Sequence, residues 1–354
     1  MTEKERVKRC IRFEAVDRAP WQFGYTSELA EQVMKEMDLE EEQCIVLGKN
    51  IFRYNRLDEF FGNHITFLRN RAVDSVLEVE TGIWCDEWGV LWDRSIDRDI
   101  GAPVNCLLED MDLDRLTVPD LNTERRFAHF FPLIRANQHR YLLVKFSYAL
   151  FERAWSLRGM EHLLMDFILN PSFVHELFSK ITEFNLALIT KLKEYPIDGI
   201  IFGDDWGWQR GLFMHPDMWR KFLKPYLAKL YSLAHSQGYD VFIHSCGDIT
   251  PVLEDLVEIG VDVFNPFQPE AMDISEIFRL YSGRLAFYGG ISIQQILPFG
   301  TPDEVKSEVK RLLGLWEKYG GYILSPSHDM PKDIPLRNIL AMMEATGLPI
   351  GNPL

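Results

Sequence analysis

Residues 239–265 read YDVFIHSCGDITPVLEDLVEIGVDVFN, and they contain one complete strand–helix–strand unit. The apolar run 239–244 is typical of a buried strand, and the helix after Pro251 is expected to stop at Gly260. A second apolar run, 261–265, follows at once. Because these runs are apolar almost throughout, instead of alternating with polar residues, they indicate a parallel sheet covered by helices.

The same order recurs through the C-terminal half of the chain. Two of its helices open with the form of a capping box, Asp273-Ile-Ser-Glu276 and Thr301-Pro-Asp-Glu304. The further strands are expected at 198–203, 285–288 and 321–324, and the further helices at 216–238, from 273, at 301–320 and at 335–346. These units make five successive β–α repeats.

The N-terminal half is less regular. Residues 20–23 and 141–147 have the pattern of strands, and 51–54 has a weaker one. Together with the five above they make eight, the number of a closed (β/α)₈ TIM barrel. Residues 74–106, rich in Trp and acidic residues, break the pattern and predict a hairpin excursion. The length of 354 residues suggests two domains, but one barrel accounts for the whole of 1–354.

Composition narrows the classes of partner. There are 38 basic and 53 acidic residues, giving a net charge of −15, which disfavours nucleic acid and an anionic membrane surface. No apolar run reaches membrane-spanning length, and the first residues lack the apolar core of a signal peptide. The five cysteines are scattered without a CxxC pair. We therefore expect a reduced, cytoplasmic protein whose metal site, if present, would use His or carboxylates as well.

Potential metal ligands follow two of the predicted strands. His244 and Cys246 are spaced i, i+2, so both side chains leave the same face if the chain stays extended. Gly247 then allows a sharp turn, and His328 after the last strand could supply a third ligand. Three N/S ligands with an open fourth position are typical of catalytic zinc. Spacing alone equally allows a buried His and Cys that pack the top of the barrel.

Acidic residues follow the neighbouring strands. Asp204 and Asp205 are adjacent, so they cannot both lie on one face, and one of them is expected to bind substrate or act as a general base near the metal. The alternative is an aspartate that accepts hydrogen bonds from loop backbone N–H groups. Glu152 could serve as a transient fourth ligand, or it could pair with an arginine such as Arg153 or Arg158.

Other polar and glycine positions at predicted strand ends are candidates for substrate binding. They are Gln22, Tyr25, Gln268 and Gly290. The chain has no GxGxxG, Walker or GxSxG motif, which argues against dinucleotide binding, P-loop chemistry and serine hydrolysis.

Three motifs carry a resemblance to a known family: His244-Ser-Cys-Gly-Asp248, the Gly-Val-Asp-Val-Phe-Asn-Pro run of 260–266, and Gly-Tyr-Ile-Leu-Ser-Pro-Ser-His of 321–328. With them the chain resembles the uroporphyrinogen decarboxylase superfamily, and within it the zinc-dependent corrinoid methyltransferases. The resemblance implies a (β/α)₈ barrel. It also implies a zinc site, in which His244 and Cys246 match the family's His-x-Cys pair and His328 stands where these methyltransferases have a later Cys.

The first predicted strand departs from the decarboxylase pattern. Uroporphyrinogen decarboxylases carry Arg-Gln-Ala-Gly-Arg-Tyr there, whose arginines meet substrate carboxylates, whereas 20–25 is Pro-Trp-Gln-Phe-Gly-Tyr. The resemblance therefore favours a zinc enzyme that moves a methyl group between a corrinoid, such as methylcobalamin carried by a partner protein, and a small thiol acceptor. The alternatives are a cofactor-free decarboxylase of a tetrapyrrole, anchored by Asp204 or Asp205, and a non-catalytic barrel that binds a ligand.

Overall fold

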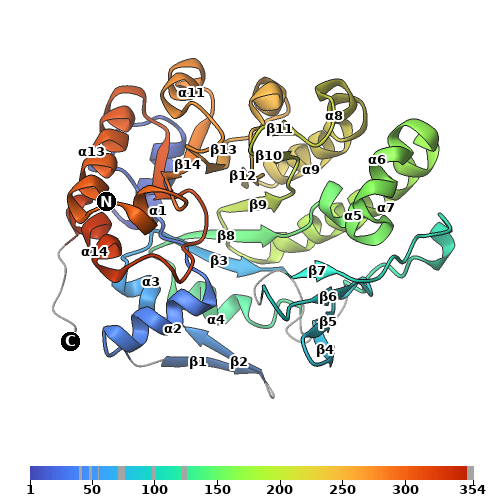
Figure 1. Ribbon diagram of the computed structural model, residues 1–354, viewed down its shortest axis with the longest axis horizontal. Coiled ribbons are helices and arrows are strands. Elements are labelled where there is room, and N and C mark those ends of the chain that lie inside the picture. Colours follow the sequence, from blue (N-terminus) through green and yellow to red (C-terminus); the bar gives the residue numbers. More distant parts are fainter. Residues whose placement is uncertain are drawn as a thin grey trace.

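A curved parallel sheet of seven strands forms the centre of the molecule (Figure 1). The computed structural model describes residues 1–39, 42–47, 50–54, 56–70, 76–97, 101–121 and 126–348. The strands lie in the order β15-β14-β13-β12-β9-β8-β3, and every neighbouring pair is parallel. Their bounds are β3 Ile65–Arg69, β8 Tyr141–Phe146, β9 Gly199–Gly203, β12 Asp240–His244, β13 Val263–Phe267, β14 Ala286–Ile291 and β15 Tyr322–Pro326.

Residues 20–23 lie between the two edge strands of this sheet. Trp21 forms a parallel bridge with Leu324 of β15, and its carbonyl accepts a hydrogen bond from the backbone N–H of His64, just before β3. The side chain of Gln22 accepts a further bond from the N–H of Ile65. A single bridge and a few hydrogen bonds, instead of an eighth regular strand, therefore join β15 to β3.

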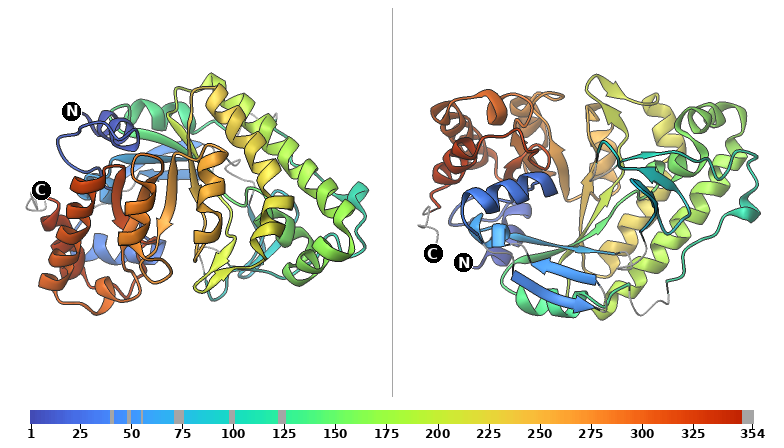
Figure 2. Two further views of the ribbon diagram at one scale, coloured as in Figure 1. Left: turned by 90° about the horizontal axis from the view of Figure 1, so that it is seen from above. Right: turned by 60° about the horizontal axis from the view of Figure 1, so that its bottom comes forward.

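Helices cover the outside of the sheet (Figure 2). They are α5 Phe151–Arg158, α6 Met160–Leu169, α7 Pro171–Lys191, α8 Pro216–Phe222, α9 Lys224–Ser236, α10 Leu253–Glu258, α11 Ile274–Tyr281, α12 Ile296–Phe299, α13 Pro302–Tyr319 and α14 Leu336–Ala345. The remaining helices are α1 Glu3–Ile11, α2 Ser27–Glu36, α3 Arg56–Phe60, α4 Phe130–Ala136 and the 3₁₀ turns Leu113–Arg115, Leu192–Glu194 and Thr250–Val252. None of the described helices is both long and apolar enough to cross a membrane.

The apolar residues divide between two cores because side chains alternate along each strand. Leu142 and Val144 of β8 pack outward among the helices. Tyr141 and Leu143 pack inward with residues of the other strands. Val7 and Ile11 of α1 join this inner core, so α1 lies against the strands from the side opposite to their carboxyl ends. Each fully buried side chain of this size contributes about 1.5–3 kcal/mol.

Capping residues place the helices of the C-terminal half. Thr301 and Glu304 form a complete capping box at the start of α13, and Asp273 caps α11 through the N–H of Glu276. The single helix predicted over 216–238 is divided into α8 and α9 around Leu223, since Pro225 has no N–H for a continuous helix.

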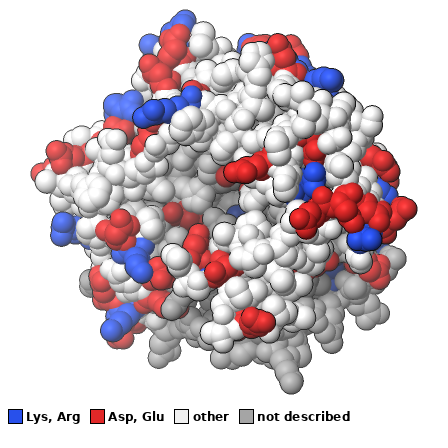
Figure 3. All heavy atoms as spheres, turned by 45° about the vertical axis from the view of Figure 1, so that its right-hand side comes forward, with Lys and Arg blue, Asp and Glu red and all other residues white. Residues whose placement is uncertain are grey.

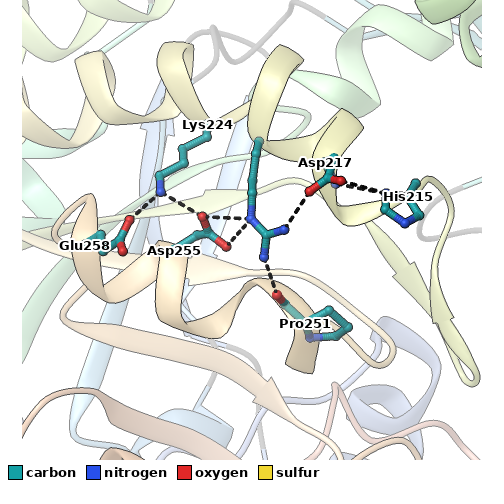
Figure 4. A network of polar contacts seen from close by, with 7 residues as sticks. His215, Asp217, Lys224, Pro251, Asp255 and Glu258 are labelled. Carbon is teal, nitrogen blue, oxygen red and sulfur yellow. Dashed lines mark hydrogen bonds and ion pairs between the residues drawn. The ribbon is translucent and has the colours of Figure 1, made fainter.

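Polar contacts join adjacent outer helices (Figure 4). Arg220 of α8 donates to Asp255 of α10 and to the carbonyl of Pro251, while Lys224 of α9 pairs with Asp255 and Glu258. Asp255 is buried, whereas Arg220 and Glu258 lie at the surface, so the pair of Lys224 with exposed Glu258 contributes little to stability. These contacts fix which helices lie side by side.

Three small antiparallel sheets accompany the central one. β1 Glu42–Leu47 pairs with β2 Asn50–Tyr54, and β10 Gly207–Trp208 pairs with β11 Gly211–Leu212. The third has four strands, β4 Leu77–Glu80, β5 Ile83–Cys85, β6 Leu91–Asp93 and β7 Ala102–Pro103, in sequence order.

Two sequence predictions need correction here. Residues 51–54 are not a strand of the central sheet: they belong to β2, and β3, which the sequence analysis missed, lies beside β8 instead. The excursion over 74–106 is a four-stranded sheet instead of a hairpin, although 74–75 and 98–100 lie outside the described residues. Short strands such as β3 carry too little periodic signal to distinguish them from their neighbours.

Candidate metal centre

Three potential ligands converge at the carboxyl ends of the strands. One ligand atom each from His244, Cys246 and His328 lies within 4.8 Å of the other two. His244 is the last residue of β12, Cys246 follows it by two positions, and His328 follows β15 by two. All three side chains are partly exposed. The arrangement joins two imidazoles and one thiol around a point that solvent can reach.

Local backbone contacts bring Cys246 into place. Its N–H donates to Oδ1 of Asp205 at 2.8 Å, and the N–H of Gly247 donates to Oε1 of Gln268 at 2.6 Å. Gly247 has φ +83°, and a Cβ there would lie 2.4 Å from the backbone nitrogen of Trp208. Only glycine fits this turn, which sends the chain under the β10–β11 hairpin immediately after the cysteine.

The geometry fits a tetrahedral zinc ion. The Nε2 of His244 lies 3.6 Å from the Sγ of Cys246. Zinc–nitrogen and zinc–sulfur bonds of about 2.0–2.3 Å at tetrahedral angles place such ligand atoms about 3.5 Å apart. The His244 and His328 rings lie with their centroids 5.3 Å apart and nearly perpendicular. Two imidazoles and a thiolate suit zinc better than they suit magnesium or calcium.

The surroundings shift the pKa values of two of these groups. Burial lowers the pKa of His244 to about 4, although nearby Asp205 acts in the opposite direction. Burial also raises the pKa of the Cys246 thiol well above its usual range, and the carboxylates of Asp205 and Glu152 add to this effect. Without a cation the site therefore holds a neutral imidazole and a protonated thiol. A bound cation would instead favour the thiolate form of Cys246 over the protonated thiol.

The adjacent acids Asp204 and Asp205 have different surroundings. Asp204 is 1% exposed, and it accepts hydrogen bonds from the N–H groups of Leu150, Phe151 and Glu152 and from the indole of Trp206. Burial raises its pKa to about 6, against the lowering effect of these bonds. Asp204 thus holds the start of α5. Asp205 is the acid that contacts the Cys246 loop.

Glu152, on the first turn of α5, is close to both aspartates. Its pKa is raised well above the usual range, first by burial and then by Asp205 and Asp204. The arginine that follows it, Arg153, pairs instead with Asp86 at 2.7 Å, and Arg158 pairs with Asp166. The structure thus places Glu152 beside the candidate metal centre without an arginine partner of its own among the described residues.

Sequence reasoning missed Lys145. It lies on β8 in the inward series with Tyr141 and Leu143, and its side chain has no hydrogen-bond or ion-pair partner among the described residues. Its charge lowers the pKa of both His244 and Cys246. The signal available in the sequence was a polar residue at an inward position of an otherwise apolar strand.

The four predicted substrate-binding residues do not form one group. Gln22 is buried and bonded to the N–H of Ile65, and Gln268 holds Gly247. Gly290 faces Tyr322 and Leu312, which a Cβ there would contact. Tyr25 is partly exposed, and burial and the carboxylate of Asp58 raise its pKa. Gln268 is thus the one of the four that accepts a hydrogen bond from the Cys246 loop.

The carboxyl ends of the strands open into a hollow. The arrowheads of β8 and β9 point to the right in Figure 1, and Figure 3 brings that side forward. Figure 3 shows a central hollow with Asp and Glu side chains in and around it. An acidic entrance favours a metal cation over a polyanionic ligand.

A curved parallel sheet with an N/S ligand set at the carboxyl ends of its strands is the architecture of a barrel enzyme. Residues 99–347 match the sequence profile of the uroporphyrinogen decarboxylase family, so the chain belongs to that family. Two curated relatives are similar to it, both named uroporphyrinogen decarboxylase. That of Chlorobium chlorochromatii is 22% identical over 66% of this chain and 68% of its own length. That of Coxiella burnetii is 23% identical over 73% of each.

A solved structure shares the whole fold. It is a methyltransferase from Methanosarcina mazei, which superposes with a TM-score of 0.75 at 18% identity and covers 98% of each chain. At this identity the likeness concerns the fold. The superposition also covers the part of the chain that precedes the family match.

Proposed function

We propose that this chain is a metal-dependent methyltransferase that moves a methyl group between a corrinoid and a small thiol. The observation that carries the proposal is the convergence of His244, Cys246 and His328 on one solvent-accessible point. Three N/S ligands leave one tetrahedral position open, as in catalytic zinc sites. A methyltransferase of the same fold in Methanosarcina mazei makes this chemistry compatible with the barrel.

The residues around the ligands have separate tasks in this proposal. Zinc held by them would bind the acceptor sulfur and keep it as a thiolate at neutral pH. Asp205 holds the Cys246 loop through the backbone N–H. The ionised form of Glu152, a stronger base because its pKa is raised, takes up the proton of the acceptor thiol. Lys145 adds a positive charge that favours a thiolate near the site.

The methyl donor approaches from the hollow in Figure 3. We propose that a separate corrinoid protein presents it over the carboxyl ends of the strands. In the reaction, the carbon–cobalt bond breaks with its electron pair left on cobalt, while the acceptor sulfur forms the new bond to the methyl carbon. The thiol proton leaves to Glu152, so charge and atoms balance.

Tetrapyrrole decarboxylation is the second candidate, and the family match and the names of the curated relatives favour it. That reaction needs fixed cations to hold several carboxylates. Residues 20–25 contain no arginine, and Asp204 is occupied by four structural hydrogen bonds. Asp205 would remain as the polar anchor.

One experiment separates these candidates. Loss of the methylcobalamin spectrum is followed with a panel of small thiols, beside coproporphyrinogen formation from uroporphyrinogen. We expect thiol-dependent demethylation that a chelator abolishes and that Cys246→Ser removes but Cys106→Ser does not. Coproporphyrinogen formation that persists without metal would contradict the proposal and favour the decarboxylase. Ligand binding without turnover in either assay would favour a non-catalytic barrel.

A further inference from the structure

His244 and Asn265 stand side by side on neighbouring strands. β12 and β13 pair in register at this position, with His244 opposite Asn265. The Nδ1 of His244 lies 2.6 Å from Oδ1 of Asn265. The other end of the same amide, Nδ2, donates to the carbonyl of Tyr288 on β14 at 3.0 Å. Asn265 is 8% exposed, so these two contacts define its environment.

The contacts determine which nitrogen of the imidazole carries the proton. A backbone carbonyl can only accept, so the group of Asn265 that faces Tyr288 must be the NH₂. The amide oxygen must then face His244, and only a protonated Nδ1 can donate to it. In a neutral imidazole the second nitrogen, Nε2, is left with its lone pair. That nitrogen is the one 3.6 Å from Sγ of Cys246.

We propose that Asn265 is a positioning residue that locks His244 in the Nδ1–H tautomer and so presents Nε2 to the metal. The inference rests on the proposed metal centre, but its first consequence concerns the metal-free protein. Asn265 itself touches neither the metal position nor the acceptor. Asn265 acts only through its hydrogen bond with His244. The carbonyl of Tyr288, which accepts from Nδ2 of Asn265, prevents a 180° flip of the side-chain amide.

The expected size of the effect follows from the way such partners act in metal sites. A ligating histidine whose other ring N–H is bound keeps one tautomer and one ring orientation, and loss of that partner weakens metal binding by about 10–100-fold. Without Asn265 the two tautomers of His244 would compete, and the ring could rotate away from Cys246. The remaining ligands, Cys246 and His328, would be unchanged.

The direct test is the tautomer itself. Nitrogen-15 NMR of the metal-free protein at pH 8 reports which ring nitrogen of His244 is protonated, with His244→Gln used to assign the signal. We expect the Nδ1–H form in the wild-type protein and a mixture of tautomers in Asn265→Leu. An Nε2–H tautomer in the wild-type protein would overturn the inference. This measurement needs no bound zinc.

Zinc affinity, measured by competition with a chromophoric chelator, provides the second readout. Asn265→Leu should weaken zinc binding by about 10–100-fold, and Asn265→Asp, which keeps an acceptor oxygen for Nδ1–H, should stay within a few-fold of wild type. Asn338→Leu is the matched control: Asn338 is fully buried and donates to the carbonyls of Leu297 and Gly300 on the outer side of the barrel. It should lower the melting temperature without changing zinc affinity.

Equal zinc affinity in Asn265→Leu and Asn338→Leu would overturn the inference. So would equal losses in Asn265→Leu and Asn265→Asp, because then the acceptor oxygen would not matter. Failure of methyl transfer with the tautomer and affinity results as expected would contradict the proposed function and leave the role of Asn265 standing. The two failures are therefore distinguishable.

Discussion

Cys246 is a partly buried thiol among carboxylates, a setting that opposes its ionisation. Burial, Asp205 and Glu152 all raise its pKa, whereas reactive cysteines usually lie in electropositive surroundings. A thiol in this setting gains reactivity only from a cation that replaces its proton.

Metal binding should therefore release the thiol proton. Because the pKa of Cys246 is raised, the thiol stays protonated up to and beyond pH 8 in the metal-free protein. His244, with its pKa lowered to about 4, is already neutral and releases nothing. We expect about one proton released per zinc, and an affinity that rises about tenfold per pH unit between pH 7.5 and 9. Calorimetry in buffers of different ionisation enthalpy measures the release, and a pH-independent affinity would contradict it.

The two neighbouring aspartates should respond differently to the same substitution. Asp204→Asn turns an NH₂ toward backbone and indole donors in a buried site, which should cost about 2–4 kcal/mol in the free energy of unfolding. Asp205→Asn keeps an oxygen for the N–H of Cys246 and should cost less than about 1 kcal/mol. Urea unfolding of the two variants measures the difference. Equal losses would show that Asp204 does not hold α5.

The convergence of the three candidate ligands was predictable because their signal is local. A pair at i, i+2 after an apolar strand shares a face whatever the rest of the fold does, and His328 follows the last strand in the same way. Lys145 and the contacts of Asn265 were not predictable, since both depend on which strand lies beside which. The sequence also did not show which of Asp204 and Asp205 has a structural role, because only the position of α5 distinguishes them.

At the level of the elements, the regular β–α units were predictable and the N-terminal half was not. Capping signals such as Thr301 and Glu304 mark helix starts within the chain itself. β3, by contrast, is a strand of five residues with no such signal, and its place beside β8 depends on α1 and residues 20–23. From the sequence, the four-stranded sheet of 77–103 could be inferred only as an interruption of the β–α pattern.

This four-stranded sheet braces the segment that carries Glu152. Asp86 accepts hydrogen bonds from the N–H groups of Trp88 and Val90, from the Trp92 indole and from Arg153 of α5. The Arg153 guanidinium lies over the rings of Trp88 and Tyr148. A single carboxylate therefore organises the sheet and joins it to the barrel.

Removing that carboxylate should loosen the sheet. We expect Asp86→Ala to speed amide hydrogen exchange throughout 76–97, because four donors lose their acceptor and Arg153 is left buried without its partner. Asp93→Ala, in the same sheet, removes a contact to Ser95 only and serves as the control. Exchange confined to residues 85–87 in Asp86→Ala would mean that the sheet is held by its apolar contacts instead.

For the molecule as a whole, we expect the fold not to depend on the candidate metal centre. The inner core joins residues from every strand of the central sheet and is closed by α1, whereas the candidate ligands lie at the end of β12 or just after β12 and β15. Lys4 and Lys8 of α1 form ion pairs with Asp198, the residue just before β9. These ion pairs hold α1 at the amino ends of the strands. A core of this size is stable without a metal.

Loss of a ligand should accordingly spare the fold. We expect His328→Ala to unfold in one cooperative transition, within a few degrees of the metal-free wild-type protein, while it loses zinc. Thermal unfolding followed by circular dichroism measures this, with chelated wild-type protein as the reference. A non-cooperative transition in the variant would indicate a structural metal.

The central claim is that His244, Cys246 and His328 hold a zinc ion that binds the sulfur of the acceptor. Zinc X-ray absorption spectroscopy of the purified protein, recorded before and after addition of a small thiol, tests it most directly. We expect about one zinc per chain with one sulfur and at least two nitrogen neighbours, and a second sulfur once the thiol is present. A protein that binds no zinc, or a zinc shell that lacks sulfur or stays unchanged with every thiol, would contradict it.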